Sequence, residues 1–289
     1  NWIQECDVVL ALGSSLTWSL YAQVIPAGKT IIHNTDNPDE LNKDEDVAIP
    51  LLGDARMTIQ ELIAAVEERG GGDESRWPDT AERLASHRKE WLSQWQPLLD
   101  SDEEPLNTYR VIGDIDRTLD RENSIVTHDA GAPRDSIVPF YTATTPHSYI
   151  GWGKTTHLGY GIPLMIGAKL ANPDKFCLNF MGDGAFGMSG LDIETSVREG
   201  APITTVVLNN GGMATYPGGY PIANELFGTA RMAGDYAKLA EGMGAVGITV
   251  TDPNEIAGAI KQAQRLNAEG RTVLLDIHTN LEARRSNFA

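Results

Sequence analysis

Cysteine, histidine and long apolar runs are scarce in this sequence, and each scarcity excludes a class of protein. Only Cys6 and Cys177 occur among 289 residues. Two cysteines are too few for a disulfide framework, so we expect buried free thiols in a reducing cytoplasm. The six histidines are scattered, and no Cys/His pair has zinc-ligand spacing. No apolar run approaches the roughly 20 residues that cross a bilayer, and no secretory signal is visible, so no membrane partner is expected.

Basic residues are also few. Lys and Arg number 23 against 40 Asp and Glu, which gives a net charge of -17. Such a surface repels phosphate backbones, so nucleic acid is not an expected partner. No Gly-x-Gly-x-x-Gly after a strand is followed by an acidic residue at the end of the next strand, which argues against a dinucleotide-dependent dehydrogenase. What remains is an ordinary soluble composition, with 41% hydrophobic residues.

Strand and helix patterns alternate along most of the chain, which predicts an α/β fold with a parallel sheet covered by helices on both faces. The pattern predicts three parts: a small α/β unit over residues 1–70, a linker helix region over 71–105, and a larger α/β domain over 106–289. The expected strands are Val8–Leu12, Thr30–His33, Val47–Leu52, Ser124–Thr127, Phe176–Met181, Ile203–Leu208, Val246–Val250 and Val273–Ile277. The expected helices are Ala55–Glu68, Tyr109–Leu119, Ile162–Leu170, Ser189–Arg198, Tyr236–Glu241 and Asn254–Arg265.

Two expected strand ends carry unusual chemistry. The strand Phe176–Met181 runs into Gly182-Asp183-Gly184, and the strand Ile203–Leu208 runs into Asn209-Asn210-Gly211-Gly212. In a parallel sheet, ligands bind at the carboxyl ends of the strands. Mg²⁺ prefers oxygen ligands, and Asp183, Asn210 and the carbonyl of Gly212 can supply three. The glycines beside Asp183 let backbone N–H groups approach a phosphate, and a helix starting near Ser189 points its positive end the same way. A Gly-Asp-Gly turn alone is usually structural, but 24 residues between the two motifs place them on neighbouring strands.

This pair of motifs resembles the thiamine diphosphate (ThDP) motif of the acetolactate synthase and pyruvate decarboxylase superfamily. The resemblance covers about residues 5–70 and 106–280. It implies that Asp183 and Asn210 are side-chain metal ligands and that Gly212 is the backbone ligand. It also implies that Gly182, Gly184, Ala185 and Met213 contact the cofactor.

Two further segments match the family. Thr127–Pro133 stands where these enzymes have a strand-end loop that touches the diphosphate, which implicates Gly131 and Ala132. Gly153–Pro163 resembles the segment that holds the aminopyrimidine. There the resemblance gives Leu158 as the bulky side chain that bends the cofactor, and the carbonyl of Thr156 as acceptor from its 4′-amino group. By itself, Leu158 would read as a core leucine.

The family's activating glutamate belongs to a separate pyrimidine-binding domain, which this sequence does not show. Residues 1–70 resemble the latter half of the family's central domain. The catalytic glutamate is therefore expected on a missing N-terminal domain or a partner chain, in a homo-oligomer (dimer or tetramer) or with a second subunit. The pattern favours a piece of a longer polypeptide over a natural subunit. A non-catalytic cofactor-binding subunit is the alternative.

Local patterns bear on the branch of the family. Ala185–Gly190 with Glu194-Thr195, and Gly13–Trp18, resemble the 2-hydroxyacyl-CoA lyase and oxalyl-CoA decarboxylase branch, although Ser15 replaces its arginine. The arginine-phenylalanine pair near the FAD of acetolactate synthases is absent, which makes FAD doubtful. The best reading is therefore a 2-hydroxyacyl-CoA lyase-like enzyme, with an acetolactate synthase-like 2-keto acid decarboxylase or carboligase as the alternative.

Three remaining segments have open interpretations. The loop Met213–Leu226 either selects the substrate or packs against a domain. The tail Leu281–Ala289 either closes over the site or frays, and fraying is favoured for a terminus. The tryptophans of the linker region, Trp77, Trp91 and Trp95, are expected to pack against a neighbouring domain rather than bind a ligand.

Overall fold

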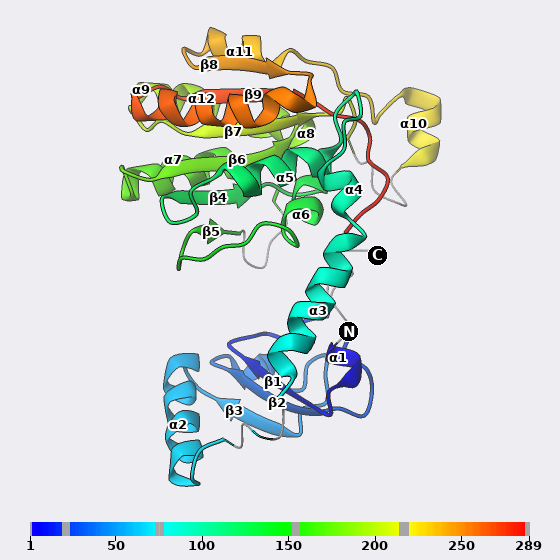
Figure 1. The fold of residues 1–289 in the computed structure, drawn as a ribbon, viewed down its shortest axis with the longest axis vertical. Helices are drawn as coiled ribbons and strands as arrows, with labels where there is room; N and C mark the ends of the chain where they lie inside the picture. The colour runs from blue at the N-terminus through cyan, green and yellow to red at the C-terminus, as the bar shows by residue number, and fades with distance from the viewer. Residues whose placement is uncertain are drawn as a thin grey trace. The chain divides into compact units, whose positions relative to one another are not determined.

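The computed structural model describes residues 2–18, 24–72, 75, 78–151, 157–213 and 220–286. The chain forms two compact units, residues 1–87 and residues 88–289 (Figure 1). Helix α3 (Thr80–Ser93) contains the boundary between them. Within the described residues, no helix is both long and apolar enough to span a membrane.

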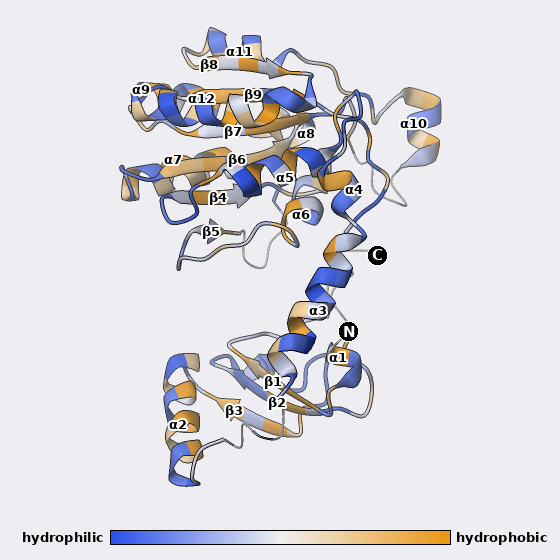
Figure 2. Cartoon of the chain, viewed as in Figure 1, coloured by the Kyte–Doolittle hydropathy of each residue, from blue (hydrophilic) through white to orange (hydrophobic). Residues whose placement is uncertain are grey.

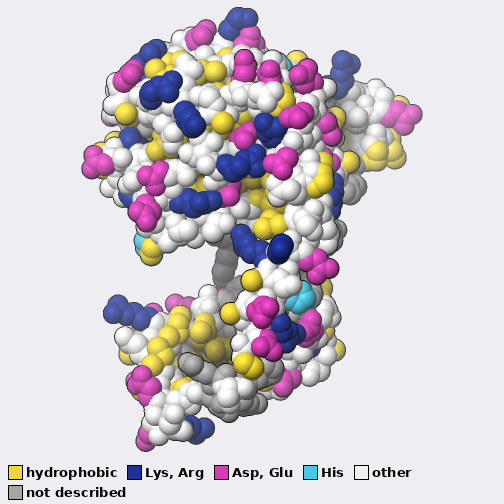
Figure 3. Space-filling model, in the orientation of Figure 1, with side chains coloured by type: hydrophobic (Ala, Val, Ile, Leu, Met, Phe, Trp, Pro, Cys, Tyr) yellow, Lys and Arg dark blue, Asp and Glu magenta, His cyan; other side chains and the backbone are white. Residues whose placement is uncertain are grey.

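The N-terminal unit is built on a three-stranded parallel sheet. Its strands β1 (Val8–Leu12), β2 (Thr30–Thr35) and β3 (Ile49–Leu52) pair in that order. Two short helices, α1 (Trp2–Glu5) and η1 (Pro38–Glu40), and the longer α2 (Ala55–Glu68) accompany them. Asn34 of β2 is fully buried, and its Nδ2 donates to the carbonyls of Leu51 and Gly53, each at 2.9 Å. Hydrophobic side chains remain exposed on this unit (Figure 3), with Val8 at 46% and Leu10 at 49%.

The C-terminal unit contains a six-stranded sheet in which every pair of neighbours is parallel. The order is β5 (Tyr149–Ile150), β4 (Ser124–His128), β6 (Phe176–Gly182), β7 (Thr204–Asn209), β9 (Val273–His278) and β8 (Val246–Val250). The helices of this unit are α4 (Gln96–Leu99), α5 (Thr108–Thr118), α6 (Ala132–Ile137), α7 (Gly161–Ala171), α8 (Asp183–Ser189), α9 (Asp192–Arg198), α10 (Pro221–Phe227), α11 (Tyr236–Gly242) and α12 (Ile256–Ala268), with η3 (Pro253–Glu255) before α12. The predicted parallel α/β sheet is confirmed.

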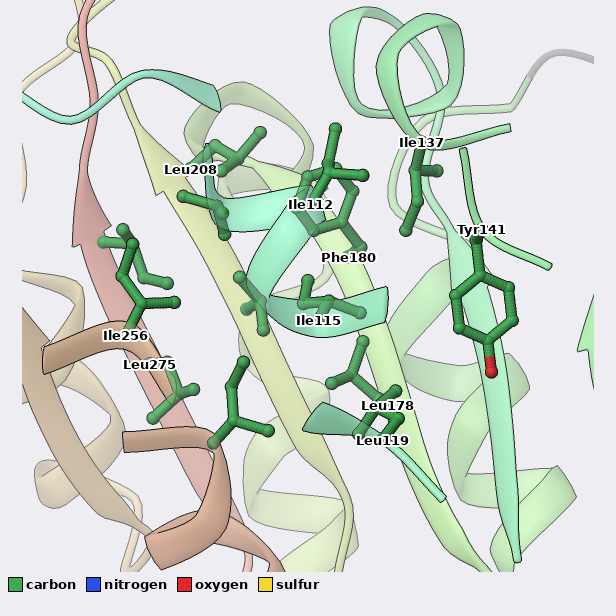
Figure 4. Packing of buried hydrophobic residues seen from close by; sticks show 14 of the residues in the cluster. Ile112, Ile115, Leu119, Ile137, Tyr141, Leu178, Phe180, Leu208, Ile256 and Leu275 are labelled. Carbon is green, nitrogen blue, oxygen red and sulfur yellow. The ribbon is translucent and has the colours of Figure 1, made fainter. Parts of the chain in front are cut away.

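Helices cover both faces of this sheet. Along β6 and β7, neighbouring side chains belong to different apolar clusters, because successive residues of a strand point to opposite faces. Leu178 and Val206 pack with α5 and α12, whereas Cys177 and Val207 pack with α7 and α9. Figure 4 shows Ile112 of α5 beside the strands of the first cluster. The strands are therefore mostly apolar (Figure 2), as expected when both faces are buried, although buried polar residues such as Asn179 and Thr204 interrupt them.

Of the linker tryptophans, Trp91 and Trp95 pack against the core of the C-terminal unit, as predicted. Trp95 is 1% exposed, and its ring lies 4.9 Å from that of Tyr109 and 5.6 Å from that of Phe140. Trp91 stacks on Phe140 with ring centroids 5.1 Å apart. Trp77 lies outside the described residues. Of the two free thiols, Cys177 is buried as expected, but Cys6 is only half-buried.

The prediction of a single helix over Ser189–Arg198 is wrong. Helix α8 begins at Asp183 and α9 at Asp192, with Gly190 between them. A Cβ on Gly190 would lie 2.6 Å from the Phe186 ring, so only glycine allows this turn. The glycines from 182 to 190 weaken the helical signal, because glycine costs about 1 kcal/mol in a helix. Asp183 thus stands in the first turn of a helix rather than in a loop.

Two other expectations are corrected. The predicted loop Met213–Leu226 contains α10, which has Pro221 in its first turn, where the missing N–H is harmless. The tail does not fray between Leu281 and Ser286. Arg285 and Ser286 are buried, and the Tyr109 hydroxyl donates to the Arg284 carbonyl at 2.9 Å. The Arg284 guanidinium also covers the Trp95 ring at 3.7 Å, which stabilises the tail in place.

Candidate cofactor-binding site

The segments that follow β4, β6 and β7 converge, since these three strands are neighbours and end at the same edge of the sheet. A Cβ placed on Gly182 would lie 3.7 Å from the ring of Pro133, in the first turn of α6, which follows the loop after β4. A Cβ on Gly184 would lie 3.2 Å from the Met213 side chain, which belongs to the loop after β7. Three segments that are distant in sequence therefore enclose one region.

Asp183 is the charged side chain at the centre of this region. It is only 2% exposed. One oxygen accepts from the N–H of Gly184 at 2.7 Å, and the other accepts from the N–H of Gly211 at 3.0 Å. Burial raises the pKa of Asp183, although the backbone hydrogen bonds from Gly184 and Gly211 act in the opposite direction. Within the described residues, no Lys or Arg forms an ion pair with it. A buried carboxylate without such a partner suits a bound cation.

The two asparagines at the end of β7 have different surroundings. Asn209 donates to the Asp276 carboxylate at 2.9 Å and to the Gly234 carbonyl at 3.2 Å, so it ties β7 to β9. Asn210 instead accepts from the N–H of Gly212 at 2.9 Å, on the loop whose Gly211 also bonds Asp183. The structure thus brings the Asp183 and Asn210 side chains to the same two-residue glycine segment.

The glycine loop after Asn210 is fixed by hydrogen bonds to the backbone of residues 230–232. Gly212 forms an antiparallel bridge with Arg231, through bonds from Met213 N–H to the Ala230 carbonyl and from Met232 N–H to the Gly211 carbonyl. The two bonds flank Gly212, and no described residue donates to the Gly212 carbonyl. Gly211 has φ +66°, a backbone conformation that favours glycine. A carbonyl oxygen in this position can serve as a ligand.

In the loop after β4, the groups that can contact a ligand are backbone groups rather than side chains. Gly131 has φ +84° and begins α6, and a Cβ there would meet nothing within 4 Å. Ala132 is the first residue of α6. Both stand at an open loop whose Pro133 lies against Gly182. Backbone N–H groups at such a position can donate hydrogen bonds to phosphate oxygens.

The remaining predicted residues differ in what the structure describes. Leu158 is half-buried and packs against the apolar cluster that includes Met165 and Phe186. Ala185 is buried in the first turn of α8. Thr156 lies outside the described residues. Sequence reasoning did not single out Asp129, a fully buried carboxylate directly after β4. The signal was present, since Asp129-Ala130-Gly131 repeats the strand-end pattern of aspartate near glycine.

The donor set decides which metal fits. The described residues contain no group of three or more His, Cys, Asp or Glu that could hold a metal. One carboxylate, one amide and one backbone carbonyl form an incomplete oxygen shell, which suits a hard cation that is also bound by phosphate oxygens. The site therefore fits a diphosphate together with Mg²⁺.

Comparisons with known proteins agree with this geometry. Residues 129–277 match the model described as thiamine pyrophosphate enzyme, C-terminal TPP binding domain, and residues 1–62 match its central domain. The chain belongs to the thiamine pyrophosphate (ThDP) enzyme family. It therefore carries a ThDP-binding domain.

Several curated relatives align along nearly the whole chain. A probable acetolactate synthase large subunit of Methanocaldococcus jannaschii is 27% identical over 95% of this chain and 46% of its own length. Oxalyl-CoA decarboxylase of Escherichia coli is 27% identical over 89% of this chain and 46% of its own. A probable sulfoacetaldehyde acetyltransferase of Rhizobium meliloti is 29% identical over 97% and 51%. The chain spans about half the length of the curated relatives it matches.

Proposed function

We propose that this chain is part of a ThDP- and Mg²⁺-dependent enzyme that makes or breaks a C–C bond next to a carbonyl. The observation that carries the proposal is the convergence of Asp183 and Asn210 on the Gly211–Gly212 segment. A buried carboxylate and an amide oxygen from adjacent strand ends can bind one cation.

In this proposal, the metal ligands are Asp183, Asn210 and the carbonyl of Gly212. The backbone of Gly131 and Ala132 would hold the diphosphate. ThDP, once bound, supplies an electron sink for the carbanion left by cleavage beside a carbonyl. The protein's own share is to bind the cofactor, to bend it with Leu158 and to exclude water.

The substrate is proposed to be a 2-keto acid or a 2-hydroxyacyl-CoA ester. Relatives named acetolactate synthase favour the first class, whereas the relative named oxalyl-CoA decarboxylase and the Ala185–Gly190 pattern favour the second. A product assay with pyruvate and with a 2-hydroxyacyl-CoA ester separates them. Carboligation of pyruvate without CoA would select the acetolactate synthase-like reading.

The activating glutamate is proposed to come from another domain or a partner chain, which requires an oligomer. Native mass spectrometry distinguishes this from the non-catalytic alternative. A longer polypeptide or a second subunit supports the enzyme. A species of 31.4 kDa that binds ThDP but has no activity supports a cofactor-binding subunit.

The metal-dependent ThDP site is tested by calorimetry on the intact protein. Wild-type protein should bind ThDP with Mg²⁺ and lose most of this affinity in EDTA. Asp183→Ala and Asn210→Ala should each weaken binding by about 2 kcal/mol or more, since each removes a metal ligand.

A matched control is Asn267→Ala. Asn267 is buried and forms three hydrogen bonds, to Ile203, Thr204 and Arg271, at the opposite edge of the sheet, where β7 begins. Its loss should lower stability but leave Mg²⁺-dependent binding intact. Unchanged ThDP affinity in Asp183→Ala would refute the proposed site.

A further inference from the structure

Asp129 is the buried carboxylate that the metal site does not use. It is 0% exposed and follows β4 directly. One of its oxygens accepts from the N–H of Ala130 at 2.7 Å and from the N–H of Gly159 at 2.9 Å. The other accepts from the N–H of Gly161 at 3.0 Å. Among the described residues, no salt bridge neutralises this carboxylate. Three backbone donors offset part of the cost of its burial, which still raises the pKa of Asp129.

These three donors belong to two separate segments. Ala130 opens the loop that leads to Gly131, on the diphosphate side of the site. Gly159 belongs to the turn before α7, and Gly161 is the first residue of α7. The N–H of Gly159 is part of the peptide bond that directly follows Leu158. One carboxylate thus joins the loop proposed to bind phosphate to the turn proposed to hold the ring end of the cofactor.

Neighbouring elements also pack closely against the same turn. Gly159 has φ +85°, and a Cβ there would lie 3.1 Å from the Met188 Cβ of α8. A Cβ on Gly161 would lie 2.2 Å from Oδ1 of Asn179, so the start of α7 rests directly on β6. The turn has little space in which to adjust. The position of this turn therefore depends on whether the Asp129 carboxylate accepts the N–H groups of both Gly159 and Gly161.

We propose that Asp129 is a positioning residue that fixes Leu158 relative to the diphosphate loop, and so sets the bend of the bound cofactor. The role rests on the proposed function. It predicts that Asp129 matters more for the ring end of ThDP than for its diphosphate.

The test compares ThDP with inorganic diphosphate, both with Mg²⁺, on the intact protein by calorimetry. In Asp129→Asn, the amide can still accept from Ala130 and Gly159, but its NH₂ group then faces the N–H of Gly161. ThDP affinity should fall about tenfold, as expected for one lost bond to a charged acceptor. Affinity for inorganic diphosphate should change less than about threefold, because diphosphate touches only the loop side.

Asn267→Ala is the control for general destabilisation, and it should preserve the preference for ThDP over diphosphate. Amide hydrogen exchange should also accelerate across Gly159–Gly161 in Asp129→Asn before any ligand is added. If Asp129→Asn does not fold, Asp129→Glu keeps both oxygens on a longer side chain and should show the same selective loss.

Two results separate the inference from the proposed function. Wild-type protein that binds no ThDP overturns the proposed function, and the role of Asp129 with it. Wild-type binding together with an equal loss of both ligands, or no loss, overturns the role of Asp129 alone.

Discussion

Without metal and cofactor, the Asp183→Asn variant should be more stable than the wild type. Once ThDP and Mg²⁺ are present, the wild type should be the more stable of the two. The side chain is 2% exposed and has two backbone donors but no cationic partner among the described residues. Taking a charge out of water costs several kcal/mol. Burial still raises the pKa of Asp183, so the two backbone bonds do not return all of this cost. Asparagine keeps the shape and loses the charge. Its oxygen keeps one of the two N–H bonds, while its NH₂ group faces the other N–H, which reduces the gain. We expect the metal-free variant to gain about 1–2 kcal/mol.

The gain should depend on pH in a defined direction. Burial raises the pKa of Asp183 above its ordinary value of 3.8. A carboxyl group with a raised pKa in the fold contributes stability that is complete below 3.8 and is lost as pH rises through the raised value. The advantage of Asp183→Asn should therefore be absent near pH 3.8 and appear as pH increases.

Thermal unfolding with and without ThDP and Mg²⁺ tests this reasoning. The C-terminal unit has about 200 residues, so 1 kcal/mol corresponds to about 2–4 °C in Tm. At a hundredfold excess over Kd, wild type should gain about 2.7 kcal/mol from the cofactor, whereas the variant should gain almost none. The order of the two Tm values should therefore reverse. A lower Tm for the metal-free variant at pH 8, or an equal cofactor shift, would refute the argument.

Two further predictions concern positions beside the site. Gly161→Ala should cost about 1–3 kcal/mol, because its Cβ would lie 2.2 Å from the buried Asn179 amide oxygen, whereas Gly167→Ala in the same helix meets nothing within 4 Å and should gain up to about 1 kcal/mol. Urea unfolding measures both, and equal effects would contradict the packing argument. Burial lowers the pKa of His128 to about 4, so stability should be complete above 6.5 and fall by roughly 3 kcal/mol as pH drops from 6.5 to 4. His128→Gln should flatten this decline, the exposed His147→Gln should not, and identical pH profiles for the two variants would rule out His128 as the source.

The alternation of strands and helices was predictable because strands buried on both faces are mostly apolar along their length. Every expected strand occurs, and Val8–Leu12 and Val246–Val250 have the expected bounds. Helix Ala55–Glu68 also has the expected bounds, since Asp54 caps its start. Errors arose where glycine or a chain terminus obscured the signal. Helix α8 was missed because its glycines read as a loop, and the tail was expected to fray although its contacts come from residues far away in sequence.

Only part of the candidate site could be predicted from the sequence, for a related reason. Asp183 and Asn210 stand at the ends of strands, so their spacing alone placed them on neighbouring loops. The different surroundings of Asn209 and Asn210 could not be read from two identical residues, because they depend on which elements lie beside β7. Asp129 likewise bonds to Gly159 and Gly161, 30 and 32 positions away.

The sequence by itself determined the layered α/β architecture, the strand ends that carry acidic and amide side chains, and the resemblance to ThDP enzymes. These follow from local composition and from the periodicity of apolar residues. Tertiary structure alone decided that three segments meet at one edge of the sheet, that the C-terminal tail packs against Trp95, and that Asp129 joins two segments. Such contacts form when distant parts of the chain pack together. A backbone N–H that donates a hydrogen bond cannot be recognised from the type of residue that provides it.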